Sequence, residues 1–103
     1  MTTAFSISSQ TDGNADYIRL HGNIDAAAEM QIKRLPSVVR SRTVRFDFSN
    51  VGRINSMGIA LLLRCLKNLR EQQGAEIYLR ELTPTNAVLF KMTGVFMLAS
   101  HEK

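Results

Sequence analysis

The sequence predicts an α/β fold, in which a mixed sheet of four to five strands packs against helices within a single domain. The 103 residues suit one compact domain and leave no room for two. Short alternating or β-branched segments are interspersed with longer segments that have the composition of helices. Helices that separate strands act as crossover connections, so much of the sheet must be parallel or mixed.

The chain begins with two predicted strands that form an antiparallel hairpin. Residues 4–8, AFSIS, alternate in polarity, as a half-buried strand does. Residues 11–14, TDGN, have the composition of a turn. Residues 16–22, DYIRLHG, alternate again and place Ile18 and Leu20 on the face opposite to the polar side chains.

The first helix is predicted to follow Asp25, whose carboxylate suits a helix N-cap. The next residues, AAAEMQIKR, include strong helix formers. A residue that precedes a proline is pushed away from helical geometry, so Leu35 and Pro36 predict that the regular helix ends near Arg34. Residues 36–40 can add one further turn.

The second half of the chain alternates strands and helices. Residues 43–48, TVRFDF, fit a central strand with Phe46 and Phe48 at core positions. The elements predicted after it are a helix at 56–73 closed by Gly74, a strand at 76–82 and a helix that Thr83 caps and that stops at Gly94. The last element is a short apolar segment at 95–99, with a short strand possible at the end.

The net charge of +4 is concentrated in one part of the sequence. The basic residues that lie close together there are Lys33, Arg34, Arg40, Arg42, Arg45 and Arg53. Such a stripe can face nucleic acid or an acidic protein. No aromatic residues interleave the arginines for base stacking, so a basic nucleic-acid accessory domain is the alternative and not the main interpretation.

Three features indicate where the protein works. The single cysteine, Cys65, cannot form an internal disulfide and fits a reducing compartment. No basic and then apolar leader opens the chain. The longest apolar run, residues 59–63, is far too short to cross a bilayer. The sequence therefore predicts a cytoplasmic domain that does not insert into a membrane.

No enzymatic or metal chemistry is expected. Cys65 and the two histidines lack the spacing of metal ligands, and no glycine-rich phosphate loop indicates a cofactor. A triad of His21, Asp25 and Ser56 would need a Gly-x-Ser-x-Gly elbow, which is absent from the sequence. The prediction is a binding module.

The helix predicted at 56–73 has two distinct faces. At about 100° per residue, the sector expected to be buried holds Ile59, Leu62, Leu63, Leu66 and Leu69. A stripe on roughly the opposite side holds Met57, Leu61, Arg64 and Asn68. Two of these four residues are large and apolar although the geometry points them at solvent, so the stripe is predicted to be a docking surface.

Ser56, at the start of this helix, has two interpretations. As an N-cap, its hydroxyl would stabilise the helix by about 1 kcal/mol. As a phosphorylation site, it would place a phosphate against the free N–H groups at the positive end of the helix dipole, where the fold tolerates the charge. The added charge of about −2 would then repel a partner docked on the stripe. Gly58 is expected to leave the backbone open to close approach by a kinase.

Two segments carry a family resemblance. LHGNID at residues 20–25, followed by DFSNVGRINSMGIALLL at residues 47–63, resembles the STAS domain of anti-sigma factor antagonists. That family shows Gly-x-Ile/Leu-Asp after its second strand, and Asp-Ser-Ser/Thr-Gly-Leu at the start of its second helix. The likeness covers nearly the whole chain. It implies one STAS domain over residues 1–103, with the usual final helix absent or very short.

The resemblance implies a bacterial partner-switching regulator. Absence of the final helix would expose an apolar face of the sheet and favour self-association, so a monomer or weak homodimer is expected. The unphosphorylated protein would bind a serine kinase, often an anti-sigma factor with a histidine-kinase-like ATP fold, and would release it when phosphorylated. A metal-dependent serine phosphatase would reverse the change. The output would be a sigma factor, secretion or biofilm control. Ser56 matches the phosphoacceptor, and Asp25 matches the acidic residue of the neighbouring loop.

The sequence departs from the family pattern beside the acceptor serine. Asn55 stands where the family has aspartate, and Met57 replaces a small hydroxyl residue. The partner-binding surface is expected to comprise Asn23, Asp25, Arg53, Asn55, Met57, Gly58, Leu61, Arg64 and Asn68. A second alternative is a structural STAS subunit of a membrane transport complex.

Overall fold

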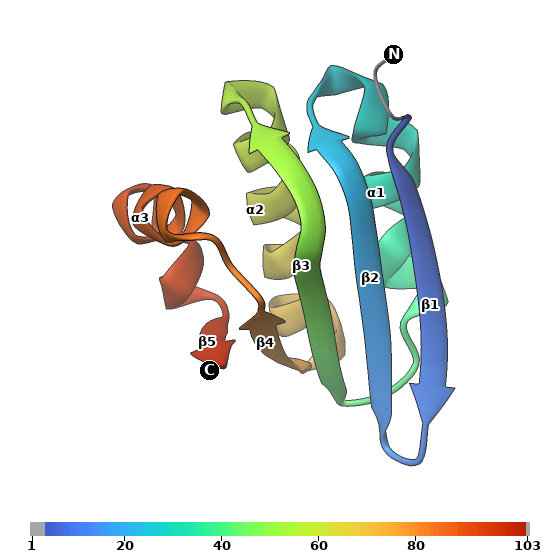
Figure 1. Cartoon of the computed structure of the whole chain (residues 1–103). Helices are drawn as coiled ribbons and strands as arrows, with labels where there is room; N and C mark the ends of the chain where they lie inside the picture. Colours follow the sequence, from blue (N-terminus) through green and yellow to red (C-terminus); the bar gives the residue numbers. More distant parts are fainter. Residues whose placement is uncertain (1–3, 103) are drawn as a thin grey trace.

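Five strands form one mixed sheet in the order β1-β2-β3-β4-β5 (Figure 1). The computed structural model describes residues 4–102. The strands, in chain order, are β1 (Ser6–Asp12), β2 (Ala15–Ile24), β3 (Thr43–Ile54), β4 (Glu76–Arg80) and β5 (Ser100–Glu102). β1 and β2 form the predicted antiparallel hairpin, and the remaining neighbours are parallel. The predicted mixed sheet is confirmed, although β1 begins and ends later than residues 4–8.

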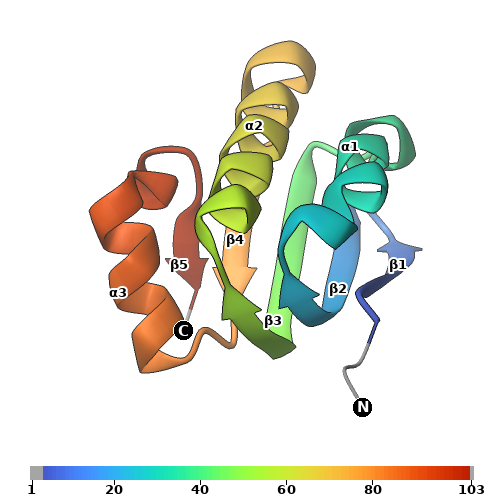
Figure 2. The same cartoon turned by 90° about the horizontal axis from the view of Figure 1, so that it is seen from above.

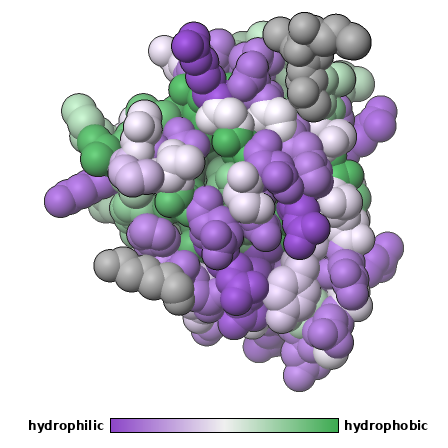
Figure 3. All heavy atoms as spheres, in the orientation of Figure 1, coloured by the Kyte–Doolittle hydropathy of each residue, from purple (hydrophilic) through white to green (hydrophobic). Residues whose placement is uncertain are grey.

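Two helices, α1 (Glu29–Val38) and α2 (Ser56–Gln73), lie side by side over one face of the sheet (Figure 2). A 3-10 turn, η1 (Ala26–Ala28), precedes α1. The third helix, α3 (Pro84–Thr93), and a second 3-10 turn, η2 (Val95–Met97), lie at the β4–β5 end. The opposite face of the sheet is open and largely hydrophilic, while hydrophobic side chains gather over α3 (Figure 3).

The core lies between the sheet and the helices. Ile18 and Leu20 of β2 and Phe46 and Phe48 of β3 are at most 1% exposed, as their alternation predicts. The ring of Phe90 in α3 packs edge-on against Phe48, with centroids 5.4 Å apart. The third helix is therefore held to the same core as the first two.

The ends of α2 and α3 confirm the prediction. α2 spans residues 56–73, and Gly74 after it adopts a left-handed conformation with φ of 66°. The Thr83 side chain accepts a hydrogen bond from the Asn86 N–H of α3, at 3.1 Å. Gly94 ends that helix with φ of 87°. These local signals were sufficient because each helix end is made by its own residues.

The end of α1 predicted near Arg34 is wrong, but the further turn expected from residues 36–40 is formed, since the helix continues through Pro36 to Val38. Leu35 is only 2% exposed, and its burial against the core keeps the residue before the proline in the helix. The Val39 N–H donates to the Leu35 carbonyl at 3.0 Å and closes the last turn. Tertiary packing outweighs the local preference at this point.

β3 is twice as long as predicted, because residues 49–54 continue the strand beyond its expected end at Phe48. The additional residues pair with the end of β2, with Gly22 beside Val51 and Ile24 beside Ile54. Two register shifts interrupt this pairing. β4 is shorter than predicted and ends at Arg80, because Glu81 takes a positive φ of 59°.

Candidate functional site

Ser56 is the first residue of α2 and lies at the end of the sheet where β2 and β3 terminate. Its side chain is exposed. The interpretation of Ser56 as the N-cap is wrong, because the side chain of the preceding residue, Asn55, caps the helix. Asn55 Oδ1 accepts a hydrogen bond from the Gly58 N–H at 2.8 Å. The Ser56 hydroxyl is thus outside the capping interaction.

Gly58 fastens the first turn of α2 to the sheet. It is buried, and a Cβ at this position would overlap the carbonyl oxygen of Ile24 at the end of β2. The Asn55 N–H donates to the same carbonyl at 3.2 Å. The expectation that Gly58 leaves the backbone open to a kinase is therefore wrong, since the absent side chain makes room for β2.

Asn23, Asp25 and Arg53 lie at the same end of the sheet as Ser56. Asn23 Oδ1 accepts a hydrogen bond from the Arg53 N–H at 2.8 Å and joins the ends of β2 and β3. The Asp25 carboxylate accepts from the Ala27 N–H at 3.0 Å and caps η1. The structure thus brings together predicted site residues that are about 30 positions apart, as the separation of Asn23 and Arg53 shows.

The predicted docking stripe on α2 is only partly exposed. Met57 is 45% exposed, and Arg64 and Asn68 are exposed as well. The prediction of Leu61 as a surface contact is wrong, because its side chain is only 3% exposed. α1 lies along α2 and covers Leu61, so the buried sector of α2 is wider than the periodicity of one helix indicates.

Between α1 and α2 a narrow groove of about 90 Å³ has Arg64 and Asn68 among its lining residues. Met30, which the sequence analysis missed, is 64% exposed in the first turn of α1. Both helices begin at the carboxyl ends of parallel strands, so Met30 and Met57 lie at the same end of the helical layer. The only sequence signal for Met30 is its place outside the sector of Ile32 and Leu35.

The basic stripe predicted from the sequence does not form one surface. Arg45 lies on the open face of the sheet, where its Nε is 3.1 Å from a Glu102 oxygen. Lys33 lies on α1, on the other side of the sheet, and its Nζ is 3.1 Å from a Glu29 oxygen. Arg45 and Lys33 thus lie on opposite sides of the sheet, so the six basic residues do not form one continuous stripe, and the nucleic-acid alternative loses support.

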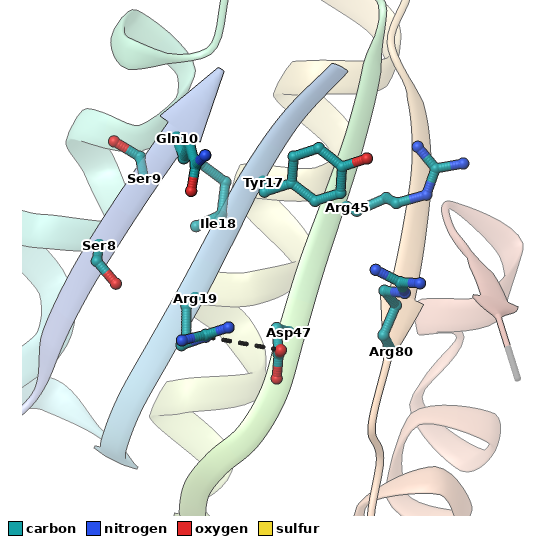
Figure 4. A pocket seen from close by; sticks show the side chains of 9 residues that line it. All are labelled: Ser8, Ser9, Gln10, Tyr17, Ile18, Arg19, Arg45, Asp47 and Arg80. Atoms are coloured by element: carbon teal, nitrogen blue, oxygen red, sulfur yellow. Dashed lines mark ion pairs between the residues drawn. The ribbon is translucent and has the colours of Figure 1, made fainter. Parts of the chain in front are cut away.

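A shallow hollow of about 190 Å³ occupies the open face of the sheet (Figure 4). Two neighbouring residue rows cross this face, one with Tyr17, Arg45 and Tyr78, the other with Arg19, Asp47 and Arg80. All of them except Tyr78 line the hollow. The Arg45 guanidinium lies 5.9 Å from the Tyr17 ring centroid and 5.1 Å from that of Tyr78. No local sequence pattern predicts these aromatic neighbours, because they belong to different strands.

Most charged side chains in this hollow form ion pairs. Arg19 pairs with Asp47 at 3.7 Å, and Arg80 pairs with Glu102 at 2.9 Å. Burial alone would raise the pKa of the Asp47 carboxyl, but hydrogen bonds from Ser49 and the charges of nearby arginines outweigh it and lower the pKa. Ile54 lies seven positions after Asp47 in β3, which places the hollow roughly 20 Å from the start of α2.

Among residues 4–102, no three His, Cys, Asp or Glu side chains are grouped so that they could hold a metal ion. Cys65 is a free thiol, and its burial raises the pKa to about 12, so that it stays protonated at neutral pH. No helix in the described part of the chain is long and apolar enough to span a bilayer.

A family model described as Mlab, STAS domain, matches residues 7–98. The chain therefore belongs to the STAS domain family, as its two motif segments indicated. No curated protein matches the sequence.

Solved structures share the fold across nearly the whole chain. The anti-sigma factor antagonist SpoIIAA in its unphosphorylated form is 19% identical, with a TM-score of 0.74 over 95% of this chain and 89% of that one. Phosphorylated SpoIIAA from Bacillus is 23% identical, with a TM-score of 0.68 over 97% and 92%. A sulfate transporter family protein from Wolinella succinogenes is 11% identical, with a TM-score of 0.74 over 88% and 80%.

Proposed function

We propose that this STAS domain is a cytoplasmic partner-switching module, without catalytic activity of its own, whose switch is Ser56. In its unphosphorylated form it binds a serine kinase of the anti-sigma type, phosphorylation of Ser56 releases the kinase, and a serine phosphatase restores binding. One observation carries the proposal. Ser56 is exposed at the N-terminus of an 18-residue helix whose cap is supplied by Asn55.

This geometry permits a phosphate without loss of the fold. The phosphate would face the free N–H groups of the first turn of α2, where an anion is stabilised by about 0.3–1 kcal/mol. The Asn55 cap and the contact between Gly58 and Ile24 do not use the Ser56 hydroxyl. Modification therefore leaves the interactions that start the helix intact.

The same phosphate would weaken partner binding. Exposed Met57 follows Ser56 directly, and a partner that covers this side chain must also desolvate the new charge of about −2. A cost of about 3 kcal/mol lowers the affinity by roughly two orders of magnitude. The proposed partner-binding surface consists of Asn23, Asp25, Arg53, Asn55, Met57, Arg64 and Asn68, with Met30 added and the buried Gly58 and Leu61 removed.

The relatives support this proposal. SpoIIAA, an anti-sigma factor antagonist with a similar fold, has been solved in unphosphorylated and phosphorylated forms. The fold therefore accommodates phosphorylation in that protein.

The test compares Ser56→Asp with Ser56→Ala in affinity capture from cell extract, read by mass spectrometry. Wild type and Ser56→Ala should retain a serine kinase, and Ser56→Asp should retain about 100-fold less of it while melting within about 2 °C of wild type. Thr85→Asp is the matched control, because it adds the same charge to the exposed first turn of α3. Equal kinase capture by Ser56→Asp, or unfolding of that variant, would contradict the proposal.

A second candidate function is a STAS subunit of a membrane transport complex. It is favoured by the similarity of the fold to that of a sulfate transporter family protein. In that case, capture from detergent extract should recover a bilayer-embedded partner, and Ser56→Asp should recover it as well as wild type.

A further inference from the structure

β1 forms an outer edge of the sheet with unpaired backbone groups. It pairs with β2 over seven consecutive residues, from Ser6 beside His21 to Asp12 beside Ala15, without a register shift. Among the described residues no strand lies on its other side (Figure 1). In an extended strand the N–H and C=O groups of alternate residues point to opposite sides, so half of those in β1 point outward.

β1 lacks the features that commonly protect an edge strand. Edge strands in natural proteins commonly contain a lysine, a proline or a β-bulge, or they are very short. The strand sequence, SISSQTD, has no lysine or proline, and its one charge is at the end, on Asp12. β5 at the other edge, by contrast, has only three residues. The β1 edge is therefore competent to accept an added strand.

A groove of about 190 Å³ lies beside this edge, on the helical side of the sheet. Its lining residues come from β1 and α1 and are Ile7, Ser9, Gln31, Arg34, Leu35 and Val38. Val38 is 48% exposed and supplies apolar surface. The Gln31 side chain donates a hydrogen bond to the Phe5 carbonyl at 2.9 Å and ties α1 to the chain just before β1.

Arg34 gives the groove its charge. It is exposed, and no described carboxylate lies within ion-pair distance of its guanidinium. A strand side chain that enters the groove beside Ser9 would reach Arg34, whereas its neighbours at i±2 would meet Ile7, Leu35 and Val38. The groove therefore suits a strand with an acidic residue between two apolar ones.

We propose that the β1 edge and this groove bind an extended segment of a partner protein as a sixth strand. The segment has apolar, acidic and apolar side chains at alternate positions facing the groove, and polar side chains facing the open side. A second copy of this chain fits less well. Two β1 strands paired antiparallel about Ser9 would bring both Arg34 guanidinium groups toward the two-fold axis. This site is independent of Ser56.

The test uses the full chain and the capped peptide Thr-Val-Thr-Glu-Thr-Val-Thr, which presents the same pattern in either direction. In two-dimensional NMR it should shift the amide signals of residues 6–12 and 31–38, and slow hydrogen exchange of the outward β1 amides. It should bind about tenfold more tightly than the matched peptide with a central lysine. Arg34→Glu should reverse this preference, and the exposed Arg42→Glu control should not.

Absence of binding up to millimolar peptide, shifts confined to other residues, or an unchanged preference in Arg34→Glu would overturn the proposal. Self-association of the free chain in analytical ultracentrifugation that masks the β1 amides would overturn it in favour of a second copy. Ser56→Asp should bind the peptide as well as wild type, so failure of the edge site and failure of the Ser56 switch remain distinguishable.

Discussion

Asn55 and Gly58 determine how α2 begins, and the sequence predicted each only in part. Asparagine and serine are both good N-cap residues, and they are adjacent here, so local preference could not choose between Asn55 and Ser56. The sequence predicts Gly58 to be an open backbone position. The structure shows that its missing side chain admits the Ile24 carbonyl, a contact between residues 34 positions apart that no local pattern reports.

Gly58→Ala should destabilise the domain although it replaces glycine by a better helix former. In an open helix position this change stabilises by roughly 1 kcal/mol. Here the new Cβ overlaps the Ile24 backbone, and overpacking costs about 1–3 kcal/mol. The free energy of unfolding in urea should therefore fall. Ala60→Gly, at an exposed site of α2, serves as the control and should cost about 1 kcal/mol. A Gly58→Ala variant as stable as wild type would disprove the steric argument.

At the scale of elements, prediction succeeded where an element is defined by its own residues. The caps and end glycines of α2 and α3 are of this kind. It failed where a neighbour decides the length. β3 continues to Ile54 because β2 provides pairing partners, and α1 passes Pro36 because Leu35 is buried. β5 belongs to the second class, since a three-residue strand has little stability apart from the ion pairs and packing that hold it.

Glu102→Gln should loosen β5 specifically. The Glu102 carboxylate is within 3.1 Å of Arg45 and 2.9 Å of Arg80, and so joins β5 to β3 and β4. Loss of its charge should lower the free energy of unfolding by about 1 kcal/mol. Hydrogen exchange of the β5 amides should accelerate more than that of β2. Glu71→Gln removes a looser pair, with Lys67 at 3.9 Å, and should change neither quantity measurably. Equal effects of the two variants would show that Glu102 does not hold the strand.

At the scale of the whole molecule, the surfaces were the hardest feature to predict. The predicted basic stripe does not form, because β3 places Arg45 on the face of the sheet opposite α1. Leu61 does not contribute to the predicted docking stripe, because α1 covers its side chain. The Tyr17–Arg45–Tyr78 row became visible only when three strands were aligned. Fold class and the position of Ser56 follow from periodicity and motif, whereas a surface depends on which elements become neighbours.

Asp16 ties distant segments together and makes global stability depend on pH. It is 3% exposed, and its carboxylate accepts hydrogen bonds from the Arg40 and Ser41 N–H groups at 2.7 and 2.9 Å, and from the Thr11 hydroxyl. Burial raises the pKa of this carboxyl, but the hydrogen bonds outweigh burial and lower the pKa below its usual value.

A lowered pKa in the folded state means that Asp16 stabilises the fold fully above pH about 4, the unfolded value. That stabilisation is lost as the pH falls below about 4 and through the lower folded pKa. Asp16→Asn should therefore be less stable than wild type at pH 7, and the gap should narrow at pH 3. Urea unfolding of both proteins at pH 7 and pH 3 measures this difference in the free energy of unfolding. A gap that is constant or wider at pH 3 would contradict the assignment.

The attachment of α2 to the end of β2 also limits the distance over which phosphorylation of Ser56 would affect binding. Because Asn55 and Gly58 hold that turn against the Ile24 backbone, the proposed phosphate on Ser56 is expected to change the local charge without displacing the turn. Its influence decays over a Debye length, about 8 Å at physiological ionic strength. The affinity of a partner bound at the N-terminus of α2 would therefore depend on phosphorylation of Ser56, whereas the affinity of a partner bound at the β1 edge would not. One small domain could thus hold one partner conditionally and a second partner constitutively.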